Sequence, residues 1–197
     1  MFRVTELFPT IQGEGRFTGE PSTFIRLQGC DVGCPWCDTK HTWDFEGPAA
    51  DMVLDELVVR CREADQRHVV ITGGEPCAQD LHPLTSTLIG NGHTVQIETS
   101  GTYEVHVHRE TWVTCSPKFS MPGGREVRDD ALRRADEIKL VVGKAADVDR
   151  ALQLLNYGPV WLQPLSQNQK ATDLCVQACL EHGFRLSVQT HKYIGVD

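Results

Sequence analysis

Three cysteines lie close enough in the chain to bind a single metal centre. They are Cys30, Cys34 and Cys37, in the segment Cys-Asp-Val-Gly-Cys-Pro-Trp-Cys. A structural zinc site usually needs four protein ligands, and no second CxxC or HxxxH follows to complete one. Three thiolates without a fourth indicate an iron-sulfur cubane with one iron open to a substrate. Three buried structural thiols, or an incomplete zinc-binding module, remain alternatives at this point.

A glycine-rich segment forms a second candidate site. Gly73, Gly74, Glu75 and Pro76 directly follow the apolar run that ends at Thr72. Glycines permit close approach of a ligand to the backbone, and a carboxylate can hold an ammonium group. Alone, the segment is more typical of a tight turn than of a binding site. Together with the cysteines it indicates a cofactor site.

The composition excludes several classes of function. The chain has 197 residues with 27 Asp plus Glu against 19 Lys plus Arg, and this acidic balance argues against a nucleic-acid-binding surface. No apolar run reaches the roughly 20 residues of a membrane span, and the first residues do not resemble a signal peptide. We therefore expect a cytoplasmic protein whose eight cysteines stay reduced. The length fits a single domain over residues 1–197.

Strand-like and helix-like segments alternate along the chain. Predicted strands cover Thr23–Gln28, Val69–Thr72, Thr94–Glu98, Trp112–Cys115, Glu137–Val142, Val160–Gln163 and Arg185–Gln189. Apolar stripes at helical spacing comprise Leu54, Leu57, Val58 and Cys61; Val148, Ala151, Leu152 and Leu155; and Leu174, Cys175, Ala178 and Cys179. This alternation predicts an α/β fold with a mainly parallel sheet and ligands at the carboxyl ends of its strands.

These motifs together resemble a known superfamily. Cx3Cx2C with Trp36 before the last cysteine, followed by the GGEP segment, resembles the radical S-adenosylmethionine (SAM) enzymes. The resemblance then narrows, nearly end to end, to the 7-carboxy-7-deazaguanine synthase family. The segments that carry it are PTIQGEG from Pro9, FIRL from Phe24, CDT from Cys37, ETSG from Glu98, SPK from Ser116, QPL from Gln163 and QTHK from Gln189.

The resemblance implies a fold and a reaction. It implies a partial, modified (β/α) barrel of about six mainly parallel strands. It also implies a carbon-nitrogen lyase that converts 6-carboxy-5,6,7,8-tetrahydropterin to 7-carboxy-7-deazaguanine with loss of ammonia, in deazapurine biosynthesis of the queuosine type. The implied cofactors are a 4Fe-4S cluster, S-adenosylmethionine and Mg²⁺. A flavodoxin-like electron donor and a homodimer are also implied.

Site residues follow from the matching motifs. The implied pterin-binding residues are Ile11, Gln12, Gly13, Glu14, Arg26, Thr72, His191 and Asp197. The implied cofactor-binding residues are Trp36, Cys37, Asp38, Gly74, Glu75, Ser116, Pro117, Lys118, Gln163, Pro164, Leu165 and Ser166. Thr39 matches the family's magnesium ligand, and the C-terminal tail would cap the substrate.

The residues themselves leave alternatives open. Arg26 could be a structural ion-pair member, Thr39 a turn or cap residue, and the last residues a frayed terminus. Cys61, Cys175 and Cys179 are typical of small buried hydrophobes of helices. As alternatives to the synthase we weigh a small activating enzyme that makes a radical on a partner protein, and a non-catalytic zinc-binding module.

Overall fold

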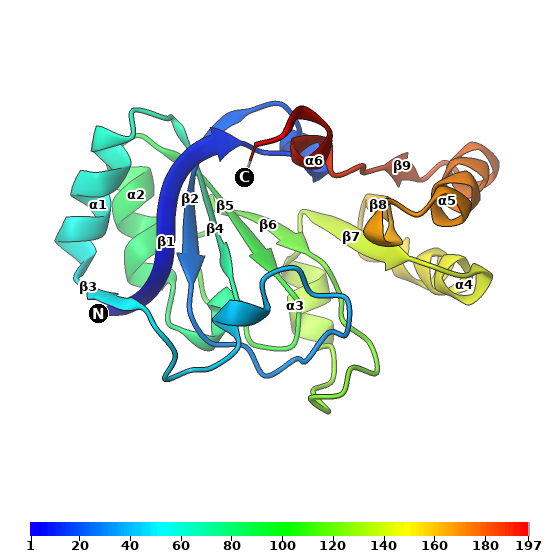
Figure 1. The fold of residues 1–197 in the computed structure, drawn as a ribbon, viewed down its shortest axis with the longest axis horizontal. Helices are drawn as coiled ribbons and strands as arrows, with labels where there is room; N and C mark the ends of the chain where they lie inside the picture. The colour runs from blue at the N-terminus through cyan, green and yellow to red at the C-terminus, as the bar shows by residue number, and fades with distance from the viewer. Residues whose placement is uncertain (197) are drawn as a thin grey trace.

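The computed structural model describes residues 1–196 and contains one nine-stranded sheet in the order β3-β1-β2-β4-β5-β6-β7-β8-β9. From β2 onward neighbouring strands are parallel, whereas β1 is antiparallel to both β2 and β3. The sheet curves without closing (Figure 1). The strands are β1 (Phe2–Ile11), β2 (Pro21–Leu27), β3 (Ala50–Met52), β4 (His68–Gly73), β5 (Thr94–Thr99), β6 (Trp112–Cys115), β7 (Glu137–Val142), β8 (Val160–Pro164) and β9 (Arg185–Leu186).

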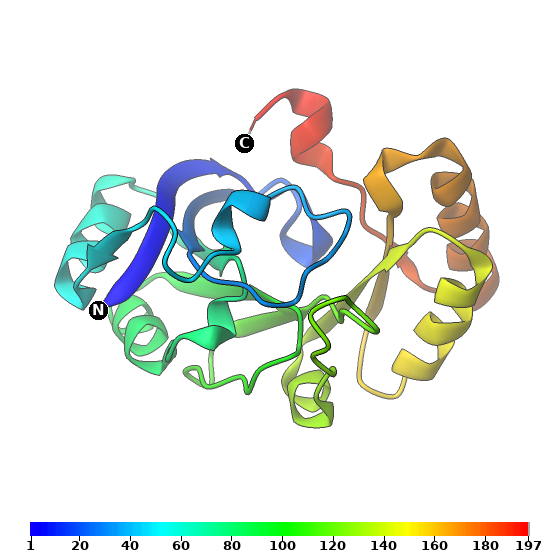
Figure 2. The same ribbon diagram turned by 60° about the horizontal axis from the view of Figure 1, so that its bottom comes forward.

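Helices cover the outer face of the curved sheet. They are α1 (Leu54–Glu63), α2 (His82–Gly90), α3 (Asp129–Arg134), α4 (Ala145–Leu154) and α5 (Gln169–His182). Helices α1 and α2 lie at one end of the molecule and α4 and α5 at the other, while the short α6 (Thr190–Ile194) lies apart from them near the end of β1 (Figures 1 and 2). None of the helices among residues 1–196 has the length and apolar character needed to cross a membrane.

Strand alternation separates an apolar outer layer from a polar interior. In β7, Ile138 and Leu140 are buried in the hydrophobic core beneath the helices. Lys139, between them, points to the opposite side of the sheet because successive strand residues face opposite ways. In β5, Ile97 is likewise in the core, whereas Glu98 faces the interior cavity. The concave face of the sheet therefore presents polar side chains, and the core lies outside it.

The predicted α/β class and mainly parallel partial barrel are confirmed. All seven predicted strands form, although β9 ends at Leu186. Strands β1 and β3 had no counterpart in the prediction, so the sheet has nine strands where the residue pattern predicted seven and the resemblance implied about six. Much of β1 remains partly exposed, and polar residues alternate along part of it, which weakens the apolar signal of a strand.

One predicted helical stripe is wrong in part. Helix α4 buries Val148 and Ala151 as expected, but its third buried side chain is Leu154. Leu152 and Leu155 are 37% and 45% exposed, since the helix ends at Leu154 and the stripe rotates away from the sheet. Among the cysteines expected to be buried in helices, Cys61 and Cys175 are fully buried and Cys179 is half-buried.

Candidate active site

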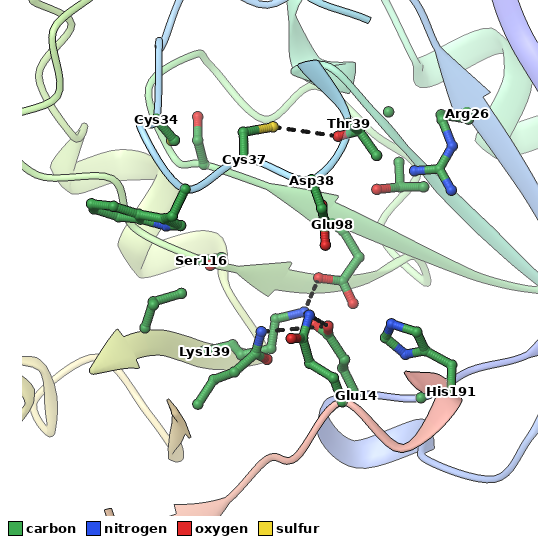
Figure 3. Close-up of a pocket in the computed structure, with 18 of the residues that line it drawn as sticks. Glu14, Arg26, Cys34, Cys37, Asp38, Thr39, Glu98, Ser116, Lys139 and His191 are labelled. Atoms are coloured by element: carbon green, nitrogen blue, oxygen red, sulfur yellow. Dashed lines mark hydrogen bonds and ion pairs between the residues drawn. The ribbon is translucent and has the colours of Figure 1, made fainter. Parts of the chain in front are cut away.

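A cavity of about 1050 Å³ opens at the carboxyl ends of the parallel strands, where ligands bind in open α/β sheets. Its walls come from strands β1, β2 and β7, the loop that bears the cysteines, the segments after β4, β5, β6 and β8, the turn after β1, and the C-terminal segment. Cys34 and Cys37 lie at one end, and Glu14, Lys139 and His191 lie at the other (Figure 3). The cavity thus joins the expected metal site to the expected substrate site.

The cysteine loop (residues 30–37) is held in place by backbone hydrogen bonds from several segments. Cys30 N–H donates to Trp43 O at 3.0 Å, and Cys37 N–H donates to Cys34 O at 3.0 Å. Gly123, from the loop after β6, donates to Val32 O at 3.1 Å. All three cysteines line the cavity as free thiols. A loop braced in this way presents its sulfur atoms from fixed backbone positions.

The donor set suits a multinuclear cluster. Burial, together with the neighbouring thiols and Glu75, raises the pKa of Cys30 to about 11, and burial raises the pKa of Cys34. Bound cations would offset that cost, because metal ligation favours the thiolate. Within residues 1–196 no three His, Cys, Asp or Glu side chains converge on one ion position. Each cysteine of a cubane binds a different iron, so the residues present fit such a cluster.

The Gly73-Gly74 segment packs directly against the cysteine loop. Gly74 N–H donates to Leu27 O at 2.9 Å and Glu75 N–H donates to Gly29 O at 2.8 Å. A Cβ on Gly74 would lie 2.2 Å from Gly29 O. A side chain is therefore excluded at this position, and glycine lets the two loops form one wall of the cavity.

Glu75 supports this wall from behind. Its carboxylate is buried and accepts hydrogen bonds from Thr99 Oγ1 at 2.6 Å, Ser100 N at 2.7 Å and Cys77 N at 3.0 Å. It does not line the cavity among the described residues, and neither does Pro117. In this structure the Glu75 side chain ties the loops after β4 and β5 together, because its carboxylate accepts from backbone and hydroxyl donors of both loops.

Arg26 has both of the features that the sequence left open. It lines the cavity and points into it (Figure 3), and its Nε donates to Glu6 Oε2 at 2.5 Å. Its guanidinium also lies 5.6 Å from the centroid of Phe8. The contacts with Glu6 and Phe8 orient the side chain, and a guanidinium so held can offer its remaining donors to a carboxylate.

The turn after β1 (residues 11–15) meets the C-terminal segment across the cavity. Thr190 N–H donates to Gly13 O at 3.0 Å, and Gln189 Nε2 donates to Glu14 Oε1 at 2.9 Å. His191 packs so closely on Gly13 that a Cβ there would lie 2.1 Å from His191 Nδ1. Burial lowers the pKa of His191, which favours a neutral imidazole. The tail therefore closes this end of the cavity.

Thr39 lies beside the metal-binding end. Its hydroxyl is 3.5 Å from Cys37 Sγ and it lines the cavity (Figure 3). Thr39 precedes a short 3-10 helix without capping it through its side chain. Its hydroxyl is therefore free of the cap role that the sequence offered as an alternative.

Comparison with known proteins places this architecture. Residues 24–110 match the model of the Radical SAM superfamily. The chain is 46% identical to the 7-carboxy-7-deazaguanine synthase of Escherichia coli strain K12 and 36% identical to that of Buchnera aphidicola, with 99% of both chains covered in each case. The chain belongs to the 7-carboxy-7-deazaguanine synthase family.

A solved structure of that family has the same fold. The crystal structure of QueE from Escherichia coli superposes with a TM-score of 0.90, at 46% identity over 96% of this chain and 94% of the other. The curved open sheet is therefore the family's fold.

Most residues that the 7-carboxy-7-deazaguanine synthase resemblance implied do meet at the cavity. Glu75 and Pro117 do not line it, and Asp197 lies outside the described residues. The other implied residues line the cavity: Ile11, Gln12, Gly13, Glu14, Arg26, Cys30, Cys34, Trp36, Cys37, Asp38, Thr39, Thr72, Gly74, Ser116, Lys118, Gln163, Pro164, Leu165, Ser166 and His191.

Several cavity residues had no predicted role. Glu98, Lys139 and Gln189 line the cavity and bond to Glu14 or to one another, and Lys192 lies beside them. Glu98 and Gln189 stood in the motifs that carry the 7-carboxy-7-deazaguanine synthase resemblance. Lys139 could have been noticed in the sequence, because it is a charged residue between apolar residues of a predicted strand.

Proposed function

We propose that the chain converts 6-carboxy-5,6,7,8-tetrahydropterin to 7-carboxy-7-deazaguanine with loss of ammonia, as a carbon-nitrogen lyase of deazapurine biosynthesis. One observation carries the proposal. A single cavity joins a three-cysteine loop to a polar end made by the turn after β1, Arg26 and the C-terminal segment. The name that the relatives carry, 7-carboxy-7-deazaguanine synthase, supports it.

The metal-binding end would hold the cofactors. Cys30, Cys34 and Cys37 would bind a 4Fe-4S cluster, which, when bound, supplies the electron that opens S-adenosylmethionine to a radical. Gly74 would admit the amino acid part of S-adenosylmethionine close to the backbone. Trp36, Asp38, Ser116, Pro117, Lys118 and the segment Gln163–Ser166 would surround the rest of the cofactor, with Glu75 behind Gly74.

The opposite end would hold the pterin. Arg26 would bind its carboxylate through a charge-assisted hydrogen bond. Gln12, Glu14 and a neutral His191 offer acceptors and donors to the ring edge, and the contact between the tail and Gly13 supports a tail that excludes water. Thr39 would bind a Mg²⁺ ion through its hydroxyl, a hard oxygen ligand of the kind that this cation prefers. Ile11 and Thr72 complete this wall, and the terminal carboxylate on Asp197 would extend it.

The remaining expectations concern assembly and partners. We propose one catalytic unit over residues 1–197, a homodimer, and a flavodoxin-like protein as the electron donor. The eight free cysteines are consistent with a reducing compartment such as the cytoplasm. Sedimentation of the cluster-loaded protein would test the dimer, and turnover with a reduced flavodoxin would test the donor.

The function is tested by an anaerobic assay with the carboxypterin, Mg²⁺ and S-adenosylmethionine. Wild type is expected to form the deazaguanine product, and Cys34→Ala is expected to lose both product formation and the cluster. Cys179→Ala is the matched control, because its half-buried thiol lies on α5 outside the cavity. Activity surviving in Cys34→Ala would refute the mechanism. Cleavage of S-adenosylmethionine without product would instead support the activating-enzyme alternative.

A further inference from the structure

Three buried charged side chains meet at the polar end of the cavity (Figure 3). Lys139 Nζ on β7 lies 2.5 Å from Glu14 Oε2 and also forms an ion pair with Glu98 Oε2 on β5. Only 5% of the Lys139 side chain and 14% of each glutamate side chain are exposed. Two strands of the sheet and the turn after β1 are thus joined through one ammonium group.

Neutral amides hold the other oxygens of the two carboxylates. Glu98 Oε1 accepts from Gln96 Nε2 at 3.1 Å and from Gln12 Nε2 at 3.3 Å. Glu14 Oε1 accepts from Gln189 Nε2 at 2.9 Å, within the segment that leads to the tail. The amides fix positions but bring no charge. Lys139 is the group that offsets the charge of both carboxylates.

The two carboxylates differ in protonation. Burial, aided by the charge of Glu14, raises the pKa of Glu98 to about 7 despite the ion pair with Lys139. Burial would also raise the pKa of Glu14, but attraction and a hydrogen bond from Lys139 lower it to about 2. One lysine shared by two buried carboxylates thus leaves Glu14 ionised and Glu98 near its titration point at neutral pH.

Other titratable groups face this cluster. Glu137 lies two residues before Lys139 on β7, where its carboxylate accepts from Thr114 Oγ1 at 2.8 Å. His191 on α6 and Lys118 after β6 also interact electrostatically with Glu14. These groups are present in every variant proposed below, so their contribution is common to all comparisons.

We propose that Lys139 is a positioning residue, a shared counter-ion that holds Glu14 and Glu98 in the arrangement and joint charge that the substrate ring meets. The inference rests on the proposed function for the identity of that ring. A pterin ring carries N–H groups that can donate hydrogen bonds to carboxylates. Without Lys139, Glu14 and Glu98 would face each other in a buried site without the ammonium group that contacts both of them. Breaking a buried pair in this way is strongly destabilising.

The first test uses the protein without substrate and compares Lys139→Met with wild type by thermal unfolding. The melting temperature is expected to fall by roughly 6 °C or more, because an uncompensated charge is left buried. The fall in melting temperature should be larger at about pH 8 than at about pH 5.5. At the lower pH one of the two carboxyls is protonated, which relieves the repulsion between them. Lys170→Met makes the same chemical change on the exposed part of α5 and should change little at either pH.

A double variant separates charge from packing. Lys139→Met with Glu14→Gln has one carboxylate and no lysine, so it should recover part of the loss in melting temperature, and the pH dependence that remains belongs to Glu98, whose charged form burial still disfavours. If Lys139→Met does not fold, the double variant is compared with Glu14→Gln alone, and its melting temperature is expected to fall more between about pH 5.5 and about pH 8, because it lacks the ammonium group that favours the charged form of Glu98. A loss that is equal at both pH values and unchanged by Glu14→Gln would overturn the counter-ion role.

The second test measures binding of the carboxypterin by calorimetry on the cluster-loaded enzyme with S-adenosylmethionine. Lys139→Met is expected to bind at least about tenfold more weakly, which corresponds to about 1.4 kcal/mol, and Lys139→Arg should recover part of the affinity. Unchanged affinity in Lys139→Met would refute the positioning role. Failure of wild type to bind the pterin would refute the proposed function, while the substrate-free measurements would still decide the role of Lys139.

Discussion

Lys192 Nζ lies 3.0 Å from Asp38 Oδ2, so the C-terminal tail is joined directly to the residue after Cys37. The same ammonium donates to Gln189 Oε1 at 2.9 Å. Residues 154 positions apart in the chain therefore meet over the cavity. This contact links the segment that covers the substrate end to the loop that carries the cysteines.

Lys192→Met should weaken closure of the tail over the substrate. The ion pair is largely exposed, with 35% of the Lys192 side chain and 63% of the Asp38 side chain accessible, so its contribution is small. We expect the KM for the carboxypterin to rise by at most about fivefold with kcat little changed. Steady-state kinetics at low and high salt would measure this.

Salt provides the control for that prediction. Added salt screens exposed ion pairs, so the difference between Lys192→Met and wild type should shrink as ionic strength rises. Lys170→Met, on α5, should show no change in KM. A KM difference that persists at high salt would mean that Lys192 acts through something other than its contact with Asp38.

Glu98→Gln should change how stability depends on pH. The native state holds a proton on Glu98 up to a pKa of about 7, against 4.5 for the unfolded chain. The native state thus binds more protons between these values, so its stability falls as pH rises from about 4.5 to about 7. A glutamine side chain cannot ionise, so the variant lacks this loss. Its free energy of unfolding relative to wild type should therefore rise by about 2 kcal/mol over that range.

Thermal or urea unfolding at several pH values would measure this gain. Glu63→Gln replaces an exposed glutamate of α1 and is the control, for which no such relative gain is expected. A constant difference between Glu98→Gln and wild type across the range would show that burial does not raise the pKa of Glu98. The comparison uses only the slope, so loss of the ion pair with Lys139 does not affect it.

Gly74→Ala should disrupt the metal-binding end. Its new Cβ would lie 2.2 Å from Gly29 O and 3.0 Å from Cys30 Cβ, so the cysteine loop would have to move. We expect less iron and sulfide per chain after anaerobic reconstitution, measured by chemical analysis and visible absorption.

Gly90→Ala is the matched control for this change. Gly90 ends α2, and a Cβ there would meet nothing within 4 Å. Alanine favours a helix over glycine, so this variant should keep its full iron content and gain up to about 1 kcal/mol in unfolding free energy. Full cluster loading in Gly74→Ala would show that the two loops need not pack as closely as they do here.

The parts of the site that are contiguous in sequence could be predicted. Cys30, Cys34 and Cys37 share one loop, and Gly74 follows a strand with a strong apolar signal, so spacing and periodicity sufficed. The strands β5 and β7 were also found because Ile97, Ile138 and Leu140 mark their apolar faces.

The Glu14–Lys139–Glu98 contact could not be predicted in the same way. Its members are up to 125 residues apart, and they meet only because β5, β6 and β7 pair in parallel with a particular register. The role of Glu75 was hidden for a similar reason. Its partners Thr99 and Ser100 lie at the end of another strand, and only the paired strands bring them to its carboxylate.

Tyr103→Phe should weaken the contacts that fix the position of the cysteine loop. Arg125 Nε lies 2.5 Å from Asp31 Oδ2, Tyr103 OH donates to the same oxygen at 3.0 Å, and the guanidinium lies 4.1 Å from the Tyr103 ring centroid. Asp31 directly follows Cys30, so the contacts of Tyr103 and Arg125 with Asp31 hold the cysteine loop in place from outside the cavity.

We expect the cluster of Tyr103→Phe to be lost faster in air than that of wild type, by a few-fold, since a hydrogen bond to a charged group contributes about 1.5–3 kcal/mol when buried and less at this half-exposed site. Arg125→Gln should act in the same direction. Arg133→Gln, which breaks an exposed ion pair with Asp129 on α3, is the control and should leave the rate unchanged. The decay of visible absorption after exposure to air gives the rates. Equal rates in all four proteins would show that the contact between Tyr103, Arg125 and Asp31 does not protect the cluster.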